Sequence, residues 1–430
     1  MLYKELLKRE SCGRRVRTAV SGAGWIGSGF VTQVAGMKGM EVSVLADTDN
    51  GLARKVLEST GVPRASIVEA DTVSRAQDAL RRGSRVVTGS YGLAAQLEDV
   101  DIVVDVTPSP AIGAETAWSC IQHGKDVVLV NIEADVTIGR ILRKRAEKAG
   151  ILYTVSNGDE PGCLMELWDY VQTLGFEPIA IGKGKNNALN IAATPDTVAE
   201  SARRDDKDPY QIASCVDGTK TMFEMACVAN ATGCLPIRRG MVGPEATRQT
   251  VSGIFALKED GGICPAPGVV DFVQGSDMSG GVFLTVRVGN ARIAEDLRYL
   301  KAGNGKYTTF FRPYHLWFIE APISVARAHI YREQWLVPLD RPVVEVMTVA
   351  KKDLAPGEVL DAFGGYSFHG SLDRAEEAKK LNALPVGLAP GARIVKPVKK
   401  GSILTWSDVT LDELCTLVKL RRQQDKEERA

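Results

Sequence analysis

The sequence lacks the residue patterns of several large classes of protein. Its eight cysteines include no C-x-x-C pair and no histidine at metal-ligand spacing, so neither a structural zinc site nor a disulfide framework is predicted. Basic and acidic residues balance at 53 each, which removes the long-range positive field typical of a nucleic-acid-binding protein. The composition therefore favours reduced cysteines and no nucleic-acid partner.

Long apolar runs are also missing. None approaches the roughly 18 residues that a membrane-spanning helix needs, and the opening MLYKELLKRESCGRRVR lacks the apolar core of a signal peptide. The sequence contains no serine-hydrolase elbow, Walker loop or zinc-enzyme motif. We therefore expect a cytoplasmic protein with no membrane contact, and the length of 430 residues favours two or three domains.

What is present begins with SGAGWIGSGF, in which Gly22, Gly24 and Gly27 have the spacing G-x-G-x-x-G. The apolar run before it predicts a strand, and WIGSGFVTQVAGMKGM predicts a helix. EVSVLAD then predicts a second strand that ends at Asp47, about 20 residues beyond the last glycine. This order is typical of a dinucleotide-binding fold, although a glycine-rich turn that binds no dinucleotide is the alternative.

In such a fold the three glycines have separate tasks. Gly22 allows the tight turn, Gly24 lets backbone N–H groups approach the pyrophosphate, and Gly27 lets the helix lie close to the sheet. Trp25 and Ile26 lie in the same turn and are further candidate contacts of the cofactor.

Asp47 bears on which dinucleotide is bound. Its carboxylate can accept both ribose hydroxyls of NAD and repel a 2′-phosphate, and the next three residues, Thr48, Asp49 and Asn50, offer no cation. Arg54 is close enough in sequence to swing back. The cofactor is therefore predicted to be NAD or NADP, with a preference for NAD.

Three further apolar runs predict strands at 101–106, 126–131 and 151–156, and helical patterns at 111–123 and 135–149 alternate with them. Continuous apolar strands between helices indicate a parallel sheet covered on both faces. The predicted fold class is α/β, with a Rossmann-type doubly wound domain over residues 1–155. The long stretch between Asp47 and Asp101 is expected to add a helix and a hairpin, or another ordered excursion.

The remaining chain has a different texture. Residues 156–342 mix glycine-rich and asparagine-rich loops with strand-like and helix-like pieces, which predicts an α+β catalytic domain. Residues 343–430 alternate short β runs with turn signals and end in a charged helix, which predicts a small β-rich domain.

Candidate site residues follow two strands of the first domain. Thr107 and Pro108, in DVTPSP, can shape the nicotinamide side of the cleft, because open α/β sheets bind ligands at the carboxyl edge. Asn131 and Glu133, in LVNIEAD, follow the next strand, and Glu133 is a candidate acid, base or metal ligand. The alternatives are a proline-stiffened loop and a glutamate in the first turn of a helix.

The second domain carries further polar groups. Adjacent acids in NGDEPG can bind a cation or transfer protons, and lysines with amides in GKGKNNALN suit an anionic or hydroxyl-rich substrate. Solvated turns and loops are the alternatives, and a lone histidine among aromatic residues is more often structural. The candidates are Asp159, Glu160, Lys183, Lys185, Asn186, Asn187, Lys220, Arg312 and His315.

Two resemblances accompany these residues. The first half, with SGAGWIGSGFVTQ and KDVVLVNIEADVTIG, resembles the homoserine dehydrogenase NAD(P)-binding domain, although Ile132 and Glu133 stand where that family leads into a catalytic lysine. Almost the whole chain resembles the 1-deoxy-D-xylulose 5-phosphate reductoisomerase-like family. The strings GDEPGCLMEL, GKGKNNALN, DGTKTMFEMACVANATG and LPVGLAPGARIVKPVKKGSILT carry that resemblance, and DLAPGEVL resembles the hallmark of a C-terminal SAF-like domain.

The second resemblance implies an NAD(P)-dependent oxidoreductase, a homodimer, that acts on a small sugar phosphate, sugar acid or polyol in carbohydrate metabolism or isoprenoid biosynthesis. In the reductoisomerase version, Lys185 and Lys220 stabilise charge on oxygen. Asp159, Glu160 and Glu133 transfer protons or hold a divalent metal, Mg or Mn. The substrate-binding candidates are Lys183, Asn186, Asn187, Arg312 and His315.

Two other functions stay open from the sequence. One is a simple alcohol or homoserine-type dehydrogenase, which would need neither rearrangement nor metal. The other is a non-catalytic NAD(P)-binding sensor, which would need no second polar constellation beyond the cofactor site.

Overall fold

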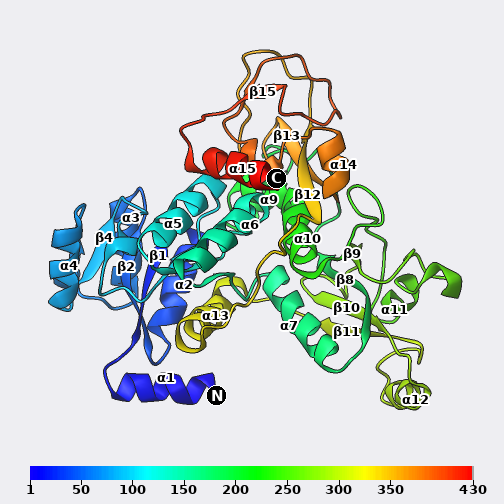
Figure 1. The fold of residues 1–430 in the computed structure, drawn as a ribbon, viewed down its shortest axis with the longest axis horizontal. Coiled ribbons are helices and arrows are strands. Elements are labelled where there is room, and N and C mark those ends of the chain that lie inside the picture. Colours follow the sequence, from blue (N-terminus) through cyan, green and yellow to red (C-terminus); the bar gives the residue numbers. More distant parts are fainter. Residues whose placement is uncertain (429–430) are drawn as a thin grey trace. The chain divides into compact units, whose positions relative to one another are not determined.

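The computed structural model describes residues 1–428, which form two compact units (Figure 1). The first unit contains Met1–Gly162, Leu316–Val337 and the described part of Leu414–Ala430, and the second contains Cys163–His315 and Pro338–Glu413. The three predicted domains, with boundaries after 155 and 342, stay a prediction. The chain enters the first unit three times.

The first unit is built on a seven-stranded sheet in the order β3-β4-β2-β1-β5-β6-β7. Every neighbouring pair in it is parallel. The strands are β1 (Val16–Ser21), β2 (Met40–Ala46), β3 (Ile67–Glu69), β4 (Arg85–Thr88), β5 (Ile102–Asp105), β6 (Asp126–Leu129) and β7 (Tyr153–Val155). This sheet confirms the predicted α/β fold with a doubly wound parallel sheet, and the strand order changes direction between β1 and β5.

The extra stretch after β2 is a second parallel crossover. It contains α3 (Asn50–Ser59), α4 (Val73–Arg81) and the strands β3 and β4, which pair in parallel. Of the two alternatives expected for this stretch, the hairpin is therefore wrong, and the structure shows an ordered excursion. A helix separates the two strands, and a strand–helix–strand connection brings the second strand back beside the first in the same direction.

Local sequence signals begin and end the helices of this unit. Asp49, Ser109 and Asn131 accept backbone N–H bonds at the starts of α3, α5 (Pro110–Gln122) and α6 (Ile132–Ala149). At the end of α6, Gly150 adopts φ 72°, the left-handed conformation that glycine permits. The helix α2 (Trp25–Ala35) has Gly24 as its N-cap residue, which has no side chain to bond the first N–H groups of the helix.

Helices from distant parts of the sequence complete the first unit. Val325 and Ala326, in α13 (Trp317–Tyr331), are fully buried in the core that also contains Phe30 and Val34 of α2. In α15 (Thr416–Glu427), the side chain of Gln424 accepts a hydrogen bond from the N–H of Ile141, at 3.0 Å, and so packs on α6. The N-terminal helix α1 (Leu2–Ser11) buries Leu6 in the same core.

The second unit contains a four-stranded mixed sheet in the order β11-β10-β8-β9. Its strands are β8 (Glu177–Lys185), β9 (Val269–Gln274), β10 (Val282–Arg287) and β11 (Tyr307–Arg312), of which β8 and β9 are parallel and the other pairs antiparallel. The helices between residues 160 and 300 are α7 (Glu160–Thr173), α8 (Ala199–Arg204), α9 (Pro209–Val216), α10 (Thr219–Thr232), α11 (Val251–Ile254) and α12 (Ala291–Tyr299). This is the mixed α+β texture that the sequence predicts.

Residues 338–413 add two small antiparallel sheets to the second unit. One pairs β12 (Val344–Ala350) with β13 (Phe368–Arg374), and the other pairs β14 (Arg393–Ile394) with β15 (Val409–Thr410); α14 (Ala375–Lys380) follows β13. The SAF-like assignment of this segment stays a prediction. Within residues 1–428, the structure has no helix with both the length and the apolar character to cross a membrane.

Candidate active site

The glycine turn between β1 and α2 has the geometry of a pyrophosphate cradle. Gly22 has φ 107°, which an L side chain rarely adopts, and its N–H donates to the carbonyl of Ala46 at 2.7 Å. A Cβ at Gly27 would lie 2.0 Å from the carbonyl oxygen of Gly22, so only glycine lets the helix approach. A Cβ at Gly24 would meet nothing within 4 Å. The N-terminus of α2 therefore opens on free space, where an anion is favoured.

Asp47 follows β2 and lies against this turn. Its carboxylate accepts from the N–H of Ala23 at 2.7 Å and from the N–H of Asp49 at 2.9 Å. Arg54, the cation that the sequence offered for a 2′-phosphate, instead donates to the carbonyl of Ile67 at 3.1 Å and lies 3.6 Å from the Glu69 carboxylate. The ribose end of the cradle therefore presents a carboxylate, while the nearby guanidinium is engaged elsewhere.

A buried polar network lies where the strand order reverses. The Asp105 carboxylate, at the end of β5, accepts from the hydroxyl of Thr107 at 2.9 Å and from the side-chain amide of Asn131 at 2.9 Å. The same amide donates to the carbonyl of Ser109 at 2.8 Å, while Pro108 is exposed. Burial raises the pKa of Asp105 to about 7, against the opposing effect of these hydrogen bonds. These hydrogen bonds fix the loop that follows β5. The loop lies against the glycine turn, because a Cβ at Gly22 would lie 3.1 Å from the Thr107 methyl.

Asp105 is a site residue that sequence reasoning missed. The signal was present, because Asp105 ends an apolar strand two residues before the predicted Thr107. Glu133 lies in the first turn of α6, half-buried, and its charge adds a minor contribution to the raised pKa of Asp105. Its role as acid, base or metal ligand stays a prediction.

The other two residues of the cofactor turn differ in their surroundings. Trp25 is the first residue of α2, is 39% exposed, and packs edge-on against Trp317, with ring centroids 4.9 Å apart. Ile26 packs partly buried against the core of the first unit. Of the two, Trp25 is the better candidate for a cofactor contact.

The predicted pair of acids follows β7, at the same edge of the sheet as the glycine turn. Asp159 is half-buried and precedes α7, whose first residue, Glu160, is buried. The turn before them is held by the N–H of Gly158, which donates to the side chain of Asn157 at 2.7 Å. Three strand spacings separate β7 from β1, a distance of about 14 Å.

In the second unit the two lysines of GKGKNNALN lie at the end of β8 and are buried. The Lys183 ammonium pairs with Glu224 of α10 at 2.5 Å, and the Lys185 amine donates to the backbone carbonyl of Cys215 at 2.5 Å. Burial, together with the positive charge of Lys183, lowers the pKa of Lys185 to about 8. Lys220, in the first turn of α10, is half-buried. The charges of all three lysines act on the Cys215 thiol, so the structure brings them together.

A second buried ion pair supports this lysine cluster, defined as Lys183, Lys185 and Lys220. Lys351, the residue directly after β12, pairs with Asp217 at 2.7 Å and donates to the carbonyls of Ala193 and Gly365 at 2.6 and 2.8 Å. Asp217 accepts in turn from the N–H of Thr219 at 2.8 Å. The pair thereby fixes the turn between the end of α9, which carries the Cys215 carbonyl, and the start of α10.

Sequence reasoning missed Asp217, Glu224 and Lys351. Glu224 lies four residues after Lys220 on the same helix, so its position was a usable signal. Nothing local linked Lys351 to a segment more than a hundred residues earlier.

The remaining candidates have other partners in the second unit. Arg312 donates to Glu166 at 2.7 Å and lies over the ring of Tyr314 at 4.8 Å, while Nδ1 of His315 lies 2.9 Å from the carbonyl oxygen of Gly280. Asn186 and Asn187 are exposed directly after β8. Their substrate-binding roles stay predictions.

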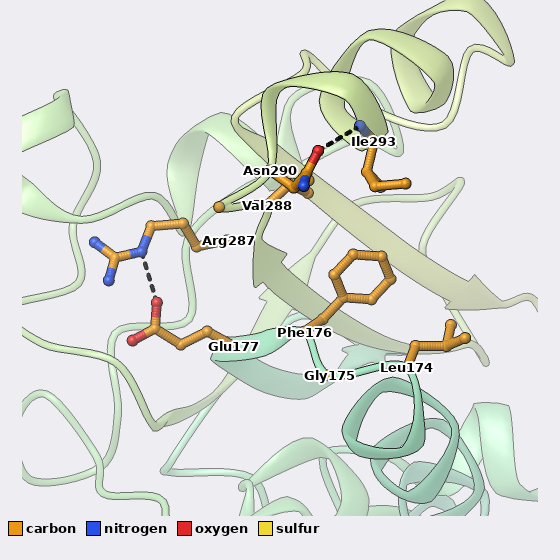
Figure 2. A pocket seen from close by; sticks show the side chains of 9 residues that line it. Leu174, Gly175, Phe176, Glu177, Arg287, Val288, Asn290 and Ile293 are labelled. Atoms are coloured by element: carbon orange, nitrogen blue, oxygen red, sulfur yellow. Dashed lines mark hydrogen bonds and ion pairs between the residues drawn. The ribbon is translucent and has the colours of Figure 1, made fainter.

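A pocket of about 430 Å³ lies at the other end of β8 (Figure 2). Phe176, Ile293 and the ion pair of Glu177 with Arg287, at 2.6 Å, line it. Glu177 and Lys185 are the two ends of one strand, about 26 Å apart. The pocket is therefore separate from the lysine cluster.

Two family models match the chain. Residues 22–155 match the homoserine dehydrogenase NAD-binding domain, and residues 158–321 match the catalytic domain of oxidoreductase DRL. No curated protein sequence matches the chain. The two matches, together with the glycine cradle, identify the chain as an NAD(P)-dependent oxidoreductase. The wider resemblance to the reductoisomerase-like family stays a prediction.

Solved structures similar to the chain are distant. A probable dehydrogenase from Thermotoga maritima has 10% identity over 74% of this chain and 90% of its own, with a TM-score of 0.43. The scyllo-inositol dehydrogenase of Lactobacillus casei has 11% identity over 74% and 88%, with a TM-score of 0.40. The 1-deoxy-D-xylulose 5-phosphate reductoisomerase of Zymomonas mobilis, in complex with NADPH, has 16% identity over 49% and 57%, with a TM-score of 0.35. Likenesses at this level carry no inference about the substrate.

Proposed function

We propose that the chain transfers a hydride between NAD and a carbon of a small polyhydroxylated substrate, a sugar acid, polyol or sugar phosphate. The observation that carries the proposal is Lys185, a buried amine whose pKa is lowered to about 8 beside a second lysine. A group with this pKa exchanges a proton readily near neutral pH, as a general acid or base must. The bound nicotinamide supplies or accepts the hydride.

Lys185 has a defined task in each direction. When an alcohol is oxidised, its neutral amine takes the hydroxyl proton; when a carbonyl is reduced, its ammonium returns a proton to the oxygen. Lys183, held by Glu224, stays beside it as a fixed cation that stabilises negative charge on that oxygen. Asn186, Asn187 and Lys220 are proposed to bind the substrate's hydroxyl or phosphate groups, which amides and ammonium groups recognise.

Arg312 and His315 are proposed as further substrate contacts. Arg312 offers several N–H donors in a plane, a geometry that matches a carboxylate or phosphate. Its present bond to Glu166 would then be exchanged for a bond to the substrate.

The homodimer is also a proposal, and light scattering, which measures the mass of the protein in solution, tests it.

A reductoisomerase that rearranges 1-deoxy-D-xylulose 5-phosphate is the second candidate. It rests on the adjacent carboxyl groups of Asp159 and Glu160, which lie within the stretch, residues 158–321, that matches the DRL catalytic domain. Carboxylate oxygens at that point suit Mg or Mn. Loss of turnover in EDTA with a branched product by NMR would support it, and an unbranched product without metal dependence would support simple dehydrogenation.

A thermal-shift screen tests the proposal. Wild-type protein is melted with NAD+ or NADPH alone and then with each member of a panel of sugar acids, polyols and sugar phosphates. A substrate adds stability beyond that of the cofactor, because it binds the folded state. If cofactor stabilises the protein but no panel member adds a shift or turns over, hydride transfer to this class is wrong and the sensor function is favoured.

The preference for NAD is a separate proposal. It is supported by the carboxylate of Asp47 at the cradle and by the engagement of Arg54 with Glu69. In Asp47→Ser we expect NAD to bind about tenfold more weakly and NADP to gain, since the repulsion of the 2′-phosphate is removed. Equal affinities of the wild-type protein for NAD and NADP would contradict this.

A further inference from the structure

The first two residues of α13 pack against two glycines that no cofactor motif explains. A Cβ at Gly29, on α2, would lie 2.5 Å from the ring of Phe318. A Cβ at Gly158, in the turn before Asp159, would lie 2.0 Å from the carbonyl oxygen of Trp317. Both positions therefore require glycine, because residues 317 and 318 approach the backbone closely there. Phe318 packs against α2, and Trp317 packs against the turn that precedes Asp159 and Glu160.

The backbone of Trp317 is strained. Its φ is 41°, a left-handed conformation that bulky side chains rarely adopt. Its N–H donates to the carbonyl of Gly158 at 2.7 Å, which holds the conformation in place. Glycine would adopt this backbone without strain, so the indole side chain is retained where it is conformationally unfavourable, a situation typical of functional positions.

Core packing does not account for the indole. Phe318 and residues further along α13 pack against the core of the first unit. Trp317 is only half-buried, and the nearby Leu316 and Ile319 are exposed. Its ring instead meets Trp25 at 4.9 Å and an interplanar angle of 72°, an edge-on aromatic pair. Trp25 directly follows Gly24, at the opening of the pyrophosphate cradle.

We propose that Trp317 is a positioning residue for the dinucleotide. Trp25 and Trp317 form one aromatic pair beside the cradle. The hydrogen bond from the N–H of Trp317 to the carbonyl of Gly158 fixes the position of this pair relative to Asp159 and Glu160. Trp317 acts on the cofactor through Trp25. The proposal requires only that the chain binds NAD(P), so it does not depend on the identity of the substrate.

A double-mutant cycle on cofactor binding tests this proposal. NADH is titrated by fluorescence into wild-type protein, Trp25→Leu, Trp317→Leu and the double variant. We expect each single variant to raise the Kd about three- to tenfold, the range of an aromatic pair. The double variant should be no weaker than the weaker single variant, because the two rings act as one unit. Additive effects, or a Kd for Trp317→Leu within about 1.5-fold of wild type, would overturn the proposal.

A second set of variants separates positioning from folding. Trp317→Gly and Trp317→Ala both remove the ring, but only glycine relieves the strain, so Trp317→Gly should melt at the same temperature as Trp317→Ala or higher. Both should still bind NADH as weakly as Trp317→Leu, whereas Trp317→Phe, which keeps a ring, should stay within about twofold of wild type. Trp118→Phe, a half-buried tryptophan of α5, is the matched control. Tight NADH binding by folded Trp317→Gly would show that the ring has no such role.

Discussion

The cofactor site and the lysine cluster are built in different ways. The cradle is made mainly by the backbone, where Gly22 and Gly27 are required by conformation and space. The lysine cluster is made by buried charges whose partners come from remote segments, such as Glu224 for Lys183. A backbone site is encoded within one short stretch, while a side-chain site depends on long-range packing. Substitutions at the two sites should therefore differ in whether they change turnover, cofactor binding or the free energy of unfolding.

The largest effect is expected at Lys185. In Lys185→Ala the proton-transfer group is lost, so kcat should fall about 10²- to 10⁴-fold while the Kd for NADH stays near wild type. Lys185→Arg keeps the charge but cannot release the proton, and should be as inactive. Steady-state kinetics with NADH titration checks both, and exposed Lys396→Ala is the control. Wild-type kcat in Lys185→Ala would refute the assignment.

The pH profile sharpens the same prediction. Because the pKa of Lys185 is lowered to about 8 in the free protein, kcat/KM for oxidation should rise through about pH 8 as the amine becomes neutral. For reduction, kcat/KM should fall over the same range. If the residual activity of Lys185→Ala kept the inflection near pH 8, the inflection would belong to another group.

Removal of Lys351 should show how a remote partner supports the cluster. Lys351→Met leaves Asp217 buried without its cation, and the free energy of unfolding should fall by about 3–5 kcal/mol. In Lys351→Met with Asp217→Asn both charges of this pair are removed, so neither is left buried without a partner and most of the loss should be recovered. Urea unfolding measures both. A double variant as unstable as the single one would show that packing, and not charge, explains the loss.

Asp105 should make the stability of the cofactor unit depend on pH. Its pKa is raised to about 7 from an ordinary value near 4, so between these pH values the folded chain holds a proton that the unfolded chain has released. Its contribution is present below about pH 4 and is lost as the pH rises through about 7. We expect the free energy of unfolding to fall by about 2–4 kcal/mol more in wild type than in Asp105→Asn over this range. Urea unfolding at about pH 4.5 and about pH 8 checks the difference. An equal fall in the free energy of unfolding in wild type and in Asp105→Asn would show that the pKa of Asp105 is not raised in the folded chain.

The smallest effect distinguishes two glycines of one motif. Gly27→Ala places a Cβ against the Gly22 carbonyl and should lower stability by about 1–3 kcal/mol, as overpacking does. Gly24→Ala meets no atom within 4 Å, so it should leave the melting temperature unchanged and weaken NADH binding instead. Thermal melts with and without NADH separate the two. Equal loss of stability in both variants would contradict the assignment.

The sequence predicted what short-range patterns encode. The β1 turn, Asp47 and the parallel strands were found because strand, glycine turn and helix follow one another along the chain. For the stretch that contains β3 and β4, the sequence leaves a hairpin and another ordered excursion open, because two short apolar runs do not reveal their relative direction. The ion pair of Lys351 with Asp217 joins segments more than a hundred residues apart, and no local pattern specifies such a contact.

The first unit is built from three separate segments of the chain, and this has a consequence for folding. The N–H of Ile141 donates a hydrogen bond to the side chain of Gln424, 283 residues later, and the core around α2 includes Val325 and Ala326. A ribosome-bound chain that had made only the seven strands would expose that core and the face of α6. The dinucleotide unit is therefore completed only after Gln424 has been synthesised, and closing such long loops should slow its folding.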